Sequence, residues 1–288
     1  MRTRHLAPLL ALGVATLLAT SAVAADSITV KGSDTMILIA QRWAEVYMKG
    51  NPGTSIQVTG GGSGTGIAAI IDGTCTLADA SRPIKQSELA KGQEKGKTIV
   101  EHKVALDALC IVVNASNTVP ALSLPQVKAI FTGAVSNWSQ VGGPDLPILL
   151  YSRESNSGTY TFLKEEVLNN ADYSASAQTL PGTAAIANAV AKDGGAVGYG
   201  GAAYFAKKTG VRIVPIKRTK DDAAVSPIKN GLVDEEAVRS MTYPISRYLY
   251  CYTSGEPAGA LKAYLDWILS PAGQKLVQDL EYVPLKPL

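Results

Sequence analysis

Short β-type runs alternate along the chain with stretches of helical period, and polar loops rich in Ser, Thr and Gly separate them. The first run spans Ser27 to Lys31, and the loop Gly32 to Thr35 follows it. The stretch from Met36 to Lys49 then places its apolar residues at helical spacing: Ile39, Trp43, Val46 and Tyr47. This pattern predicts a strand, a polar loop and an amphipathic helix in succession.

The same succession occurs twice more. A strand at Ser55 to Thr59 leads through the glycine-rich loop Gly60 to Gly66 into a helix that starts at Ile67. A strand at Ile148 to Tyr151 leads through the segment Arg153 to Thr159 into another helix. The three units do not repeat one sequence, but their junctions are of one structural type.

The remaining apolar runs favour α/β sheets. A short strand is predicted at Thr76 to Ala80, and longer ones at Asp107 to Val113 and Arg247 to Tyr252. We interpret the second of these as a strand that leaves one lobe for another, and the third as the strand that returns. The expected fold is therefore α/β with two lobes.

Each strand–loop–helix junction is a candidate anion site. The first N–H groups of a helix lack internal partners, and the aligned peptide dipoles place partial positive charge there. Ser and Thr hydroxyls add donors, and Gly lets the backbone approach a ligand closely. The candidate ligand-binding residues are Ser33, Asp34, Thr35, Ser63, Gly64, Thr65, Ser81, Arg82, Arg153, Ser157, Gly158 and Thr159.

The segment from Arg153 to Thr159 is the most specific of these signals, because it joins a fixed cation to the donor-rich start of a helix. The guanidinium fork of arginine matches two oxygens of a tetrahedral anion. The alternative is that Ser157 only caps the helix and that Arg153 pairs with an acid at the surface.

Two other candidates also have alternative interpretations. Asp34 either accepts a proton from a protonated ligand or caps the helix that begins at Met36. Arg82 either faces the same ligand or is a surface charge beside Pro83, which fixes a turn.

The sequence offers little material for nucleotide binding or catalysis. Ile67 follows Gly66 where a Walker loop requires Lys and then Ser or Thr, and no convincing acid for a ribose follows the loop. Outside the N-terminal segment His102 is the only histidine, so a Ser–His–Asp triad is not indicated. No His/Cys cluster has metal-ligand spacing. We expect a non-enzymatic protein without a cofactor.

The N-terminus reads as a secretory signal. Arg2 and Arg4 precede an uncharged run from Leu6 to Ala25, and the small-residue pattern Ala22 to Ala24 predicts a signal peptide of residues 1–24. Cleavage after Ala25 and an uncleaved membrane anchor are the alternatives. We expect a soluble periplasmic protein without membrane insertion after cleavage. Removal of the two arginines lowers Lys+Arg from 27 to 25 against 24 Asp+Glu, so the charge is nearly neutral and nucleic acid is not an expected partner.

Three cysteines allow at most one internal disulfide. If the two long candidate strands are neighbours, Cys110 and Cys251 lie opposite each other and are the candidate pair. The alternative is two unpaired buried thiols. Cys75 is expected to pack as a small apolar residue.

Several motifs together resemble the PstS family, the periplasmic substrate-binding proteins of the phosphate ABC importer. The resemblance covers essentially the whole chain after the signal. It rests on Gly32-Ser33-Asp34-Thr35, Gly62 to Gly66, Asp72 to Cys75 with Ser81-Arg82-Pro83, Asp107 to Asn114, Ile130 to Gly133 with Asn137-Trp138, and Arg153 to Thr159.

This resemblance implies a periplasmic-binding-protein-like fold of type II, with two α/β lobes and a two-strand hinge. Lobe 1 would hold residues 25–113 and 248–288, and lobe 2 would hold residues 114–247. The implied function is capture of inorganic phosphate between the lobes by a monomer, which then docks on the membrane permease of an ABC importer. The positions that match the family's ligand contacts are Ser33, Thr35, Ser63, Arg153, Ser157, Gly158 and Thr159.

One departure from the family pattern concerns selectivity. Some members carry an aspartate after the Ser of the third segment, where it accepts the phosphate proton and so rejects fully ionised sulfate. That position is Arg82 here. Either Asp34 takes over as the acceptor of the phosphate proton, or selectivity has another origin. The alternative ligand is therefore another tetrahedral oxyanion: sulfate, molybdate, tungstate or arsenate.

Overall fold

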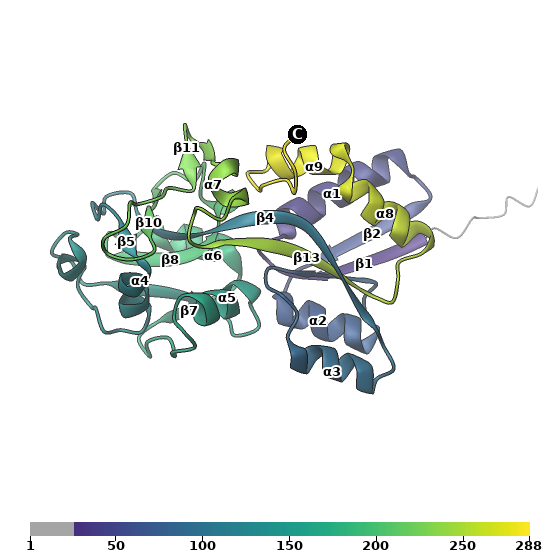
Figure 1. The fold of residues 1–288 in the computed structure, drawn as a ribbon, viewed down its shortest axis with the longest axis horizontal. Helices are drawn as coiled ribbons and strands as arrows, with labels where there is room; N and C mark the ends of the chain where they lie inside the picture. The colour runs from purple at the N-terminus through teal and green to yellow at the C-terminus, as the bar shows by residue number, and fades with distance from the viewer. Residues whose placement is uncertain (1–25) are drawn as a thin grey trace, which may run out of the picture.

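The computed structural model describes residues 26–288, so the predicted signal peptide lies outside the described part. Two halves lie side by side, and one mixed sheet of nine strands runs through both (Figure 1). Its strands are β1 (Asp26–Gly32), β2 (Thr54–Thr59), β3 (Leu77–Ala80), β4 (Ile99–Asn114), β6 (Leu149–Arg153), β7 (Gln178–Leu180), β8 (Ala196–Gly201), β9 (Val211–Ile213) and β13 (Ser246–Ser254). The strand order is β2-β1-β3-β13-β4-β8-β6-β7, and β9 also pairs with β4.

Helices cover the sheet, and short elements fill the second half. The helices are α1 (Ile37–Gly50), α2 (Ser63–Asp72), α3 (Gln86–Glu94), α4 (Leu124–Phe131), α5 (Gly158–Glu166), α6 (Gly182–Val190), α7 (Glu235–Arg239), α8 (Gly259–Leu269) and α9 (Pro271–Asp279). The short elements are β5 (Leu122–Ser123), β10 (Ile216–Lys217), β11 (Ile228–Lys229), β12 (Leu232–Val233) and the 3₁₀ turns η1 (Trp138–Val141) and η2 (Ala202–Tyr204). None of the helices within residues 26–288 is long and apolar enough to cross a membrane.

The long strand β4 joins the two halves together with β13 (Figure 1). From Ile99 to Ala108 it pairs antiparallel with β13, and from Leu109 to Val113 it pairs with β8. Its residues from Val104 to Val113 are all buried, which matches a strand covered on both faces. The predicted strand started only at Asp107, because the polar residues Glu101, His102 and Lys103 interrupt the apolar pattern before it.

Hydrophobic cores lie on both sides of this crossing. Leu106 to Val113 of β4 pack with α4, α6 and β8 in one core. Val104 and Ala105 of the same strand pack with β1 and α1 in the other. The lobe boundaries expected at residues 113/114 and 247/248 stay a prediction. Within β4, Ala105 packs in the core of the first half and Leu106 in that of the second, so the change of core lies inside the strand rather than at its end.

The predicted disulfide between Cys110 and Cys251 is wrong. The three cysteines of the described residues are free and buried. The two strands are neighbours as expected, but the register pairs Cys251 with His102, while Cys110 pairs with Gly200 of β8. With roughly 3.3 Å per strand residue, the offset from residue 102 to residue 110 is far longer than a disulfide spans.

Candidate functional site

The three predicted junctions lie where the two halves meet. Thr35 precedes α1, Ser63 opens α2 and Thr159 lies in the first turn of α5. The starts of α1 and α2 come from the first half of the molecule, and that of α5 comes from the second. The positive ends of three helix dipoles therefore point to one region, as the sequence predicted.

A cluster of hydroxyl groups occupies this region, and we call Thr35, Ser63, Ser81 and Thr159 the hydroxyl cluster. Thr35 Oγ1 lies 2.7 Å from Thr159 Oγ1, which in turn lies 3.4 Å from Ser81 Oγ. Ser81 Oγ lies 3.4 Å from Ser63 Oγ. All four residues are buried, so these neutral donors lie in a site from which most water is excluded.

Backbone packing at the start of α5 keeps the hydroxyl cluster compact. A β-carbon at Gly158 would lie only 2.2 Å from Ser63 Oγ and 2.8 Å from Ser81 Oγ. Glycine at this position therefore lets the first turn of α5 approach the residues of the other half. The main-chain N–H groups of that turn are thereby brought close to the cluster.

Arg153 ends β6 and is almost fully buried. Its Nη2 donates to Asp34 Oδ2 across the two halves at 2.6 Å, and its Nη1 donates to Thr183 Oγ1 at 3.0 Å. The surface ion pair considered as its alternative role is thus wrong. The guanidinium is held at the boundary between the halves by one acid and one hydroxyl.

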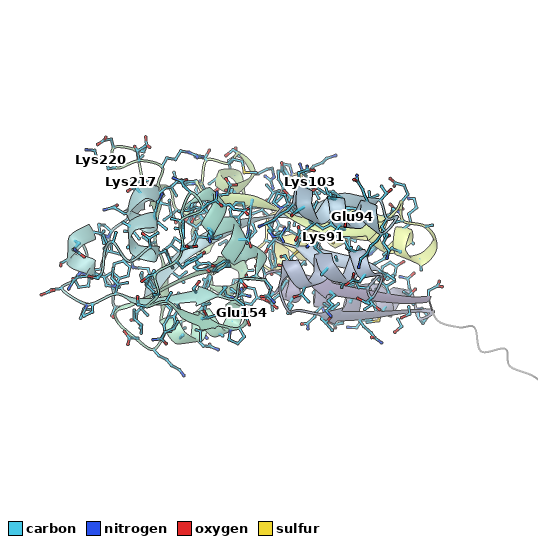
Figure 2. The ribbon with its side chains drawn as sticks, turned by 90° about the horizontal axis from the view of Figure 1, so that it is seen from below. Lys91, Glu94, Lys103, Glu154, Lys217 and Lys220 are labelled. Atoms are coloured by element: carbon cyan, nitrogen blue, oxygen red, sulfur yellow. The ribbon has the colours of Figure 1, made fainter. Side chains whose placement is uncertain are left out.

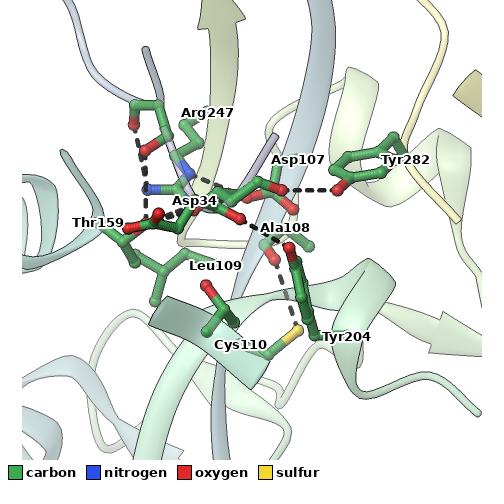
Figure 3. Close-up of polar contacts among 12 residues, drawn as sticks. Asp34, Asp107, Ala108, Leu109, Cys110, Thr159, Tyr204, Arg247 and Tyr282 are labelled. Atoms are coloured by element: carbon green, nitrogen blue, oxygen red, sulfur yellow. Dashed lines mark hydrogen bonds and ion pairs between the residues drawn. The ribbon is translucent and has the colours of Figure 1, made fainter. Parts of the chain in front are cut away.

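Asp34 does not cap α1, because the cap residue of that helix is Met36 and no side-chain bond closes its first turn. The second carboxylate oxygen, Oδ1, instead accepts from the backbone N–H of Gly61 at 2.8 Å. The main-chain carbonyl of Asp34 accepts from the Tyr204 hydroxyl of the second half at 2.6 Å (Figure 3). Asp34 therefore links its own loop to the glycine loop and to the other half.

Ser33, Ser157, Gly64 and Thr65 lie beside the hydroxyl cluster. Ser33 is buried, and its hydroxyl has no hydrogen-bond partner within residues 26–288. Ser157 caps α5, accepting from the N–H of Tyr160 at 3.3 Å, which agrees with its alternative role. The N–H of Gly64 and the hydroxyl of Thr65 both bond to Asn156, at 2.9 and 3.2 Å.

Arg82 is buried, but its guanidinium is turned away from the hydroxyl cluster. It donates through Nη1 and Nη2 to the two oxygens of Glu88, at 2.9 and 2.7 Å, and Nη1 also donates to the carbonyl of Pro83. The predicted contact of Arg82 with the ligand is therefore not supported. Its sequence neighbour Ser81 does reach the site, where its hydroxyl contacts those of Ser63 and Thr159.

A different arginine lies at the cluster, and it was not among the residues predicted from the sequence. Arg247, in β13, donates through Nε and Nη2 to Asp107 Oδ2 at 3.0 and 2.7 Å, and through Nη2 to Thr159 Oγ1 at 3.1 Å (Figure 3). Both charged residues are buried, and burial raises the pKa of Asp107 although Arg247 lowers it. A charged residue inside each of two apolar strands was the signal that could have revealed the pair.

Charged residues of both signs lie elsewhere on the molecule. Lys217 and Lys220 belong to the second half, whereas Lys91 and Glu94 lie on α3 of the first (Figure 2). Within the described residues, no group of three or more His, Cys, Asp or Glu side chains could hold a metal ion. The candidate ligand-binding groups at the boundary between the halves are therefore the buried arginines and the hydroxyl cluster.

Comparison with solved structures identifies the fold. The chain resembles a putative phosphate ABC transporter substrate-binding protein with bound phosphate from Clostridium perfringens, with a TM-score of 0.79 and 27% identity. The match covers 91% of this chain and 100% of that one. An ABC-type phosphate transport receptor from Vibrio cholerae matches with a TM-score of 0.69 and 26% identity, over 90% and 100% of the two chains. The predicted two-lobed α/β fold is thereby confirmed.

Comparison with curated sequences identifies the family. The phosphate-binding protein PstS of Pseudomonas aeruginosa is 33% identical over 88% of this chain and 81% of its own length. The protein of the same name from Bacillus subtilis is 30% identical, over 91% of this chain and 82% of its own. A family model described as a PBP superfamily domain matches residues 19–272. The chain belongs to the PBP superfamily and, within it, to the PstS family of phosphate-binding proteins.

Proposed function

We propose that this protein captures inorganic phosphate between its two lobes and delivers it to the membrane permease of an ABC importer. The observation that carries the proposal is the buried hydroxyl cluster, formed at the starts of three helices from both halves and flanked by Arg153. Neutral donors and helix ends suit a small oxyanion, because they offer many hydrogen bonds without fixing excess charge inside the protein. The names of relatives point the same way, since they include two phosphate-binding proteins and a phosphate ABC transporter substrate-binding protein with bound phosphate.

In this proposal, phosphate binding is coupled to closure of the two lobes. Thr35 and Ser63 from one half and Thr159 from the other would each donate to the same anion, so the ligand stabilises the closed form. In the structure the hydroxyls of Thr35 and Thr159 bond to each other across the boundary. An oxyanion would replace those contacts with bonds to its own oxygens, and the permease would recognise the closed shape.

Calorimetry tests the proposal directly. Protein lacking residues 1–24 should bind phosphate at one site, and Arg153→Met should weaken binding about 10- to 100-fold, since a charged hydrogen bond contributes roughly 1.5 to 3 kcal/mol. Lys220→Met, at an exposed basic residue, is the matched control and should bind like wild type. Absence of phosphate binding between pH 5 and 9 would contradict the proposal.

Competition defines the ligand. Phosphate should displace sulfate, molybdate and tungstate, and arsenate should compete most closely because it shares the shape and protonation of phosphate. We propose that Asp34 is the acceptor of the ligand proton, since its carboxylate already lies against Arg153 at the boundary. Sulfate binding that matched phosphate binding would assign the site to fully ionised oxyanions instead.

We also propose export to the periplasm, cleavage after Ala24 and a monomeric, non-enzymatic protein. Fractionation of cells with N-terminal sequencing should find Ala25 as the first residue of the exported chain. Sedimentation should give a monomer mass. A chromogenic phosphate ester should not be hydrolysed in the presence of divalent metals, and turnover would contradict the binding-protein assignment.

A further inference from the structure

Arg247 is a buried arginine in β13, one of the two strands that join the halves. Its guanidinium contacts three different parts of the molecule: Asp107 of β4, the carbonyl of Ser81 and the hydroxyl of Thr159. Ser81 lies in the first half and Thr159 in the second. A single cation therefore bridges both halves from the joining strands, next to the hydroxyl cluster (Figure 3).

The hydrogen bonds of this guanidinium leave part of its donor capacity available. Arginine carries five N–H bonds. Two are directed to Asp107 Oδ2 and one to the carbonyl of Ser81, and these three fix the plane of the group. A further N–H reaches Thr159 Oγ1 at 3.1 Å, which is the atom that also contacts Thr35 and Ser81.

The contact with Thr159 fixes where the cation points. Since Thr159 Oγ1 accepts from Arg247, its own hydroxyl proton can be donated to a neighbouring hydroxyl or, when an oxyanion is bound, to that ligand. An oxyanion placed among the hydroxyls of Thr35, Ser81 and Thr159 lies within reach of the same guanidinium edge. By contrast, both terminal nitrogens of Arg82 are occupied by Glu88 away from the cluster.

We propose that Arg247 is a further phosphate-binding residue of this protein and that Asp107 is the positioning residue that orients it. The assignment rests on the proposed function. Arg247 donates to the anion beside Thr159, and Asp107 holds the guanidinium in a plane that faces both halves. Because Thr159 belongs to the second half and Ser81 to the first, the three residues surround the anion together only when the halves are closed.

Two variants matched in charge test the role of Arg247. The double substitution Arg247→Met with Asp107→Asn removes both members of the buried pair and leaves no unpaired carboxylate. Arg82→Met with Glu88→Gln does the same to the partly buried pair of Arg82 and Glu88. Phosphate affinity by calorimetry should fall about 10- to 100-fold in the first and stay within about threefold of wild type in the second.

The pH profile separates binding from structural support. A cation that touches the anion attracts dianionic phosphate more than monoanionic phosphate, since the Coulomb energy scales with ligand charge. In Arg247→Lys, which keeps the charge beside Asp107 but loses the fork, affinity should fall while the ratio of affinities at pH 8.5 and 5.5 stays near that of wild type. In the Arg247→Met, Asp107→Asn variant that ratio should also fall. Thermal unfolding checks that each variant is folded.

The outcomes are distinct. Equal loss of affinity in the two double variants, or an unchanged affinity without Arg247, would overturn the role of Arg247 while wild-type binding still supports the proposed function. If the first double variant does not fold, Arg247→Lys decides the question, because unchanged affinity in that variant would overturn the contact. Wild-type protein that binds no phosphate would overturn both proposals together.

Discussion

Asp79 offers a test of the energetics of the first half that can be worked out from the structure. Its carboxyl group lies in β3, and the residue is 4% exposed. The Cys251 thiol donates to Asp79 Oδ1 at 3.2 Å, and no cation pairs with this carboxyl among the described residues. Burial raises the pKa of Asp79 from 3.8 to about 7, because the charged form loses its hydration.

The sign of the effect on stability follows from proton binding. Between pH 4 and pH 7, approximately, folded protein keeps a proton on Asp79 that unfolded protein has lost. The free energy of unfolding therefore falls as the pH rises through this window and levels off above the pKa of the folded state. A difference of about three pKa units corresponds to at most about 4 kcal/mol, because one unit is about 1.4 kcal/mol.

Asp79→Asn should remove this loss, since asparagine has nearly the same shape and stays neutral. We expect the unfolding free energy of the variant, relative to wild type, to increase by about 2 to 3 kcal/mol between pH 5 and pH 8 in urea titrations. Asp72→Asn is the control, because Asp72 pairs with Lys95 at the surface and should leave the slope with pH as in wild type. Parallel pH profiles for wild type and Asp79→Asn would refute the reasoning.

Three further predictions concern the boundary between the halves. Asn156→Ala removes side-chain hydrogen bonds to the carbonyl of Gly61 and the hydroxyl of Thr65. Phosphate release in stopped-flow experiments should therefore accelerate about 5- to 30-fold. An unchanged rate would show that this contact does not stabilise the closed form. Gly158→Ala places a methyl group against Ser63 and should weaken phosphate binding at least tenfold, whereas wild-type affinity would argue against close approach at α5. Ser157→Ala removes the cap of α5 and should lower the unfolding free energy by about 1 kcal/mol in denaturant titrations, and no change would exclude a capping role.

The sequence pattern was sufficient for the junctions that build the site. Gly32 to Thr35, the glycine loop and Arg153 to Thr159 each follow a strand and precede a helix, and the structure brings them together. The start of α2 was harder to predict. The helix begins at Ser63 rather than Ile67, because Gly62 adopts a left-handed φ of 89° and the glycine-rich residues after it enter the helix despite their poor intrinsic propensity.

Strand register was beyond the reach of the sequence. Neighbouring joining strands were predicted, but nothing local fixes whether Cys251 lies opposite Cys110 or opposite His102. The register depends on packing along the whole of β4, which extends to Ile99 through polar residues that resemble a loop. A shift of several residues along one strand changes every cross-strand pair, so the disulfide prediction failed while the prediction of neighbouring strands succeeded.

The contrast between Arg82 and Arg247 shows what kind of reasoning would have found the second cation. Arg82 has an acid close by in sequence. Glu88, in the first turn of α3, accepts hydrogen bonds from its guanidinium, so Arg82 does not need a ligand or a distant residue to balance its charge. Arg247 lies in an apolar strand, and no acid stands between Glu236 and Glu256 in the sequence. A buried guanidinium must be paired, so Arg247 required a partner from a distant segment. Asp107, the acid at the start of the other predicted joining strand, was the candidate that the pattern itself supplied. An arginine without a local acid therefore indicates long-range structure, whereas an arginine beside a serine motif does not by itself indicate a ligand.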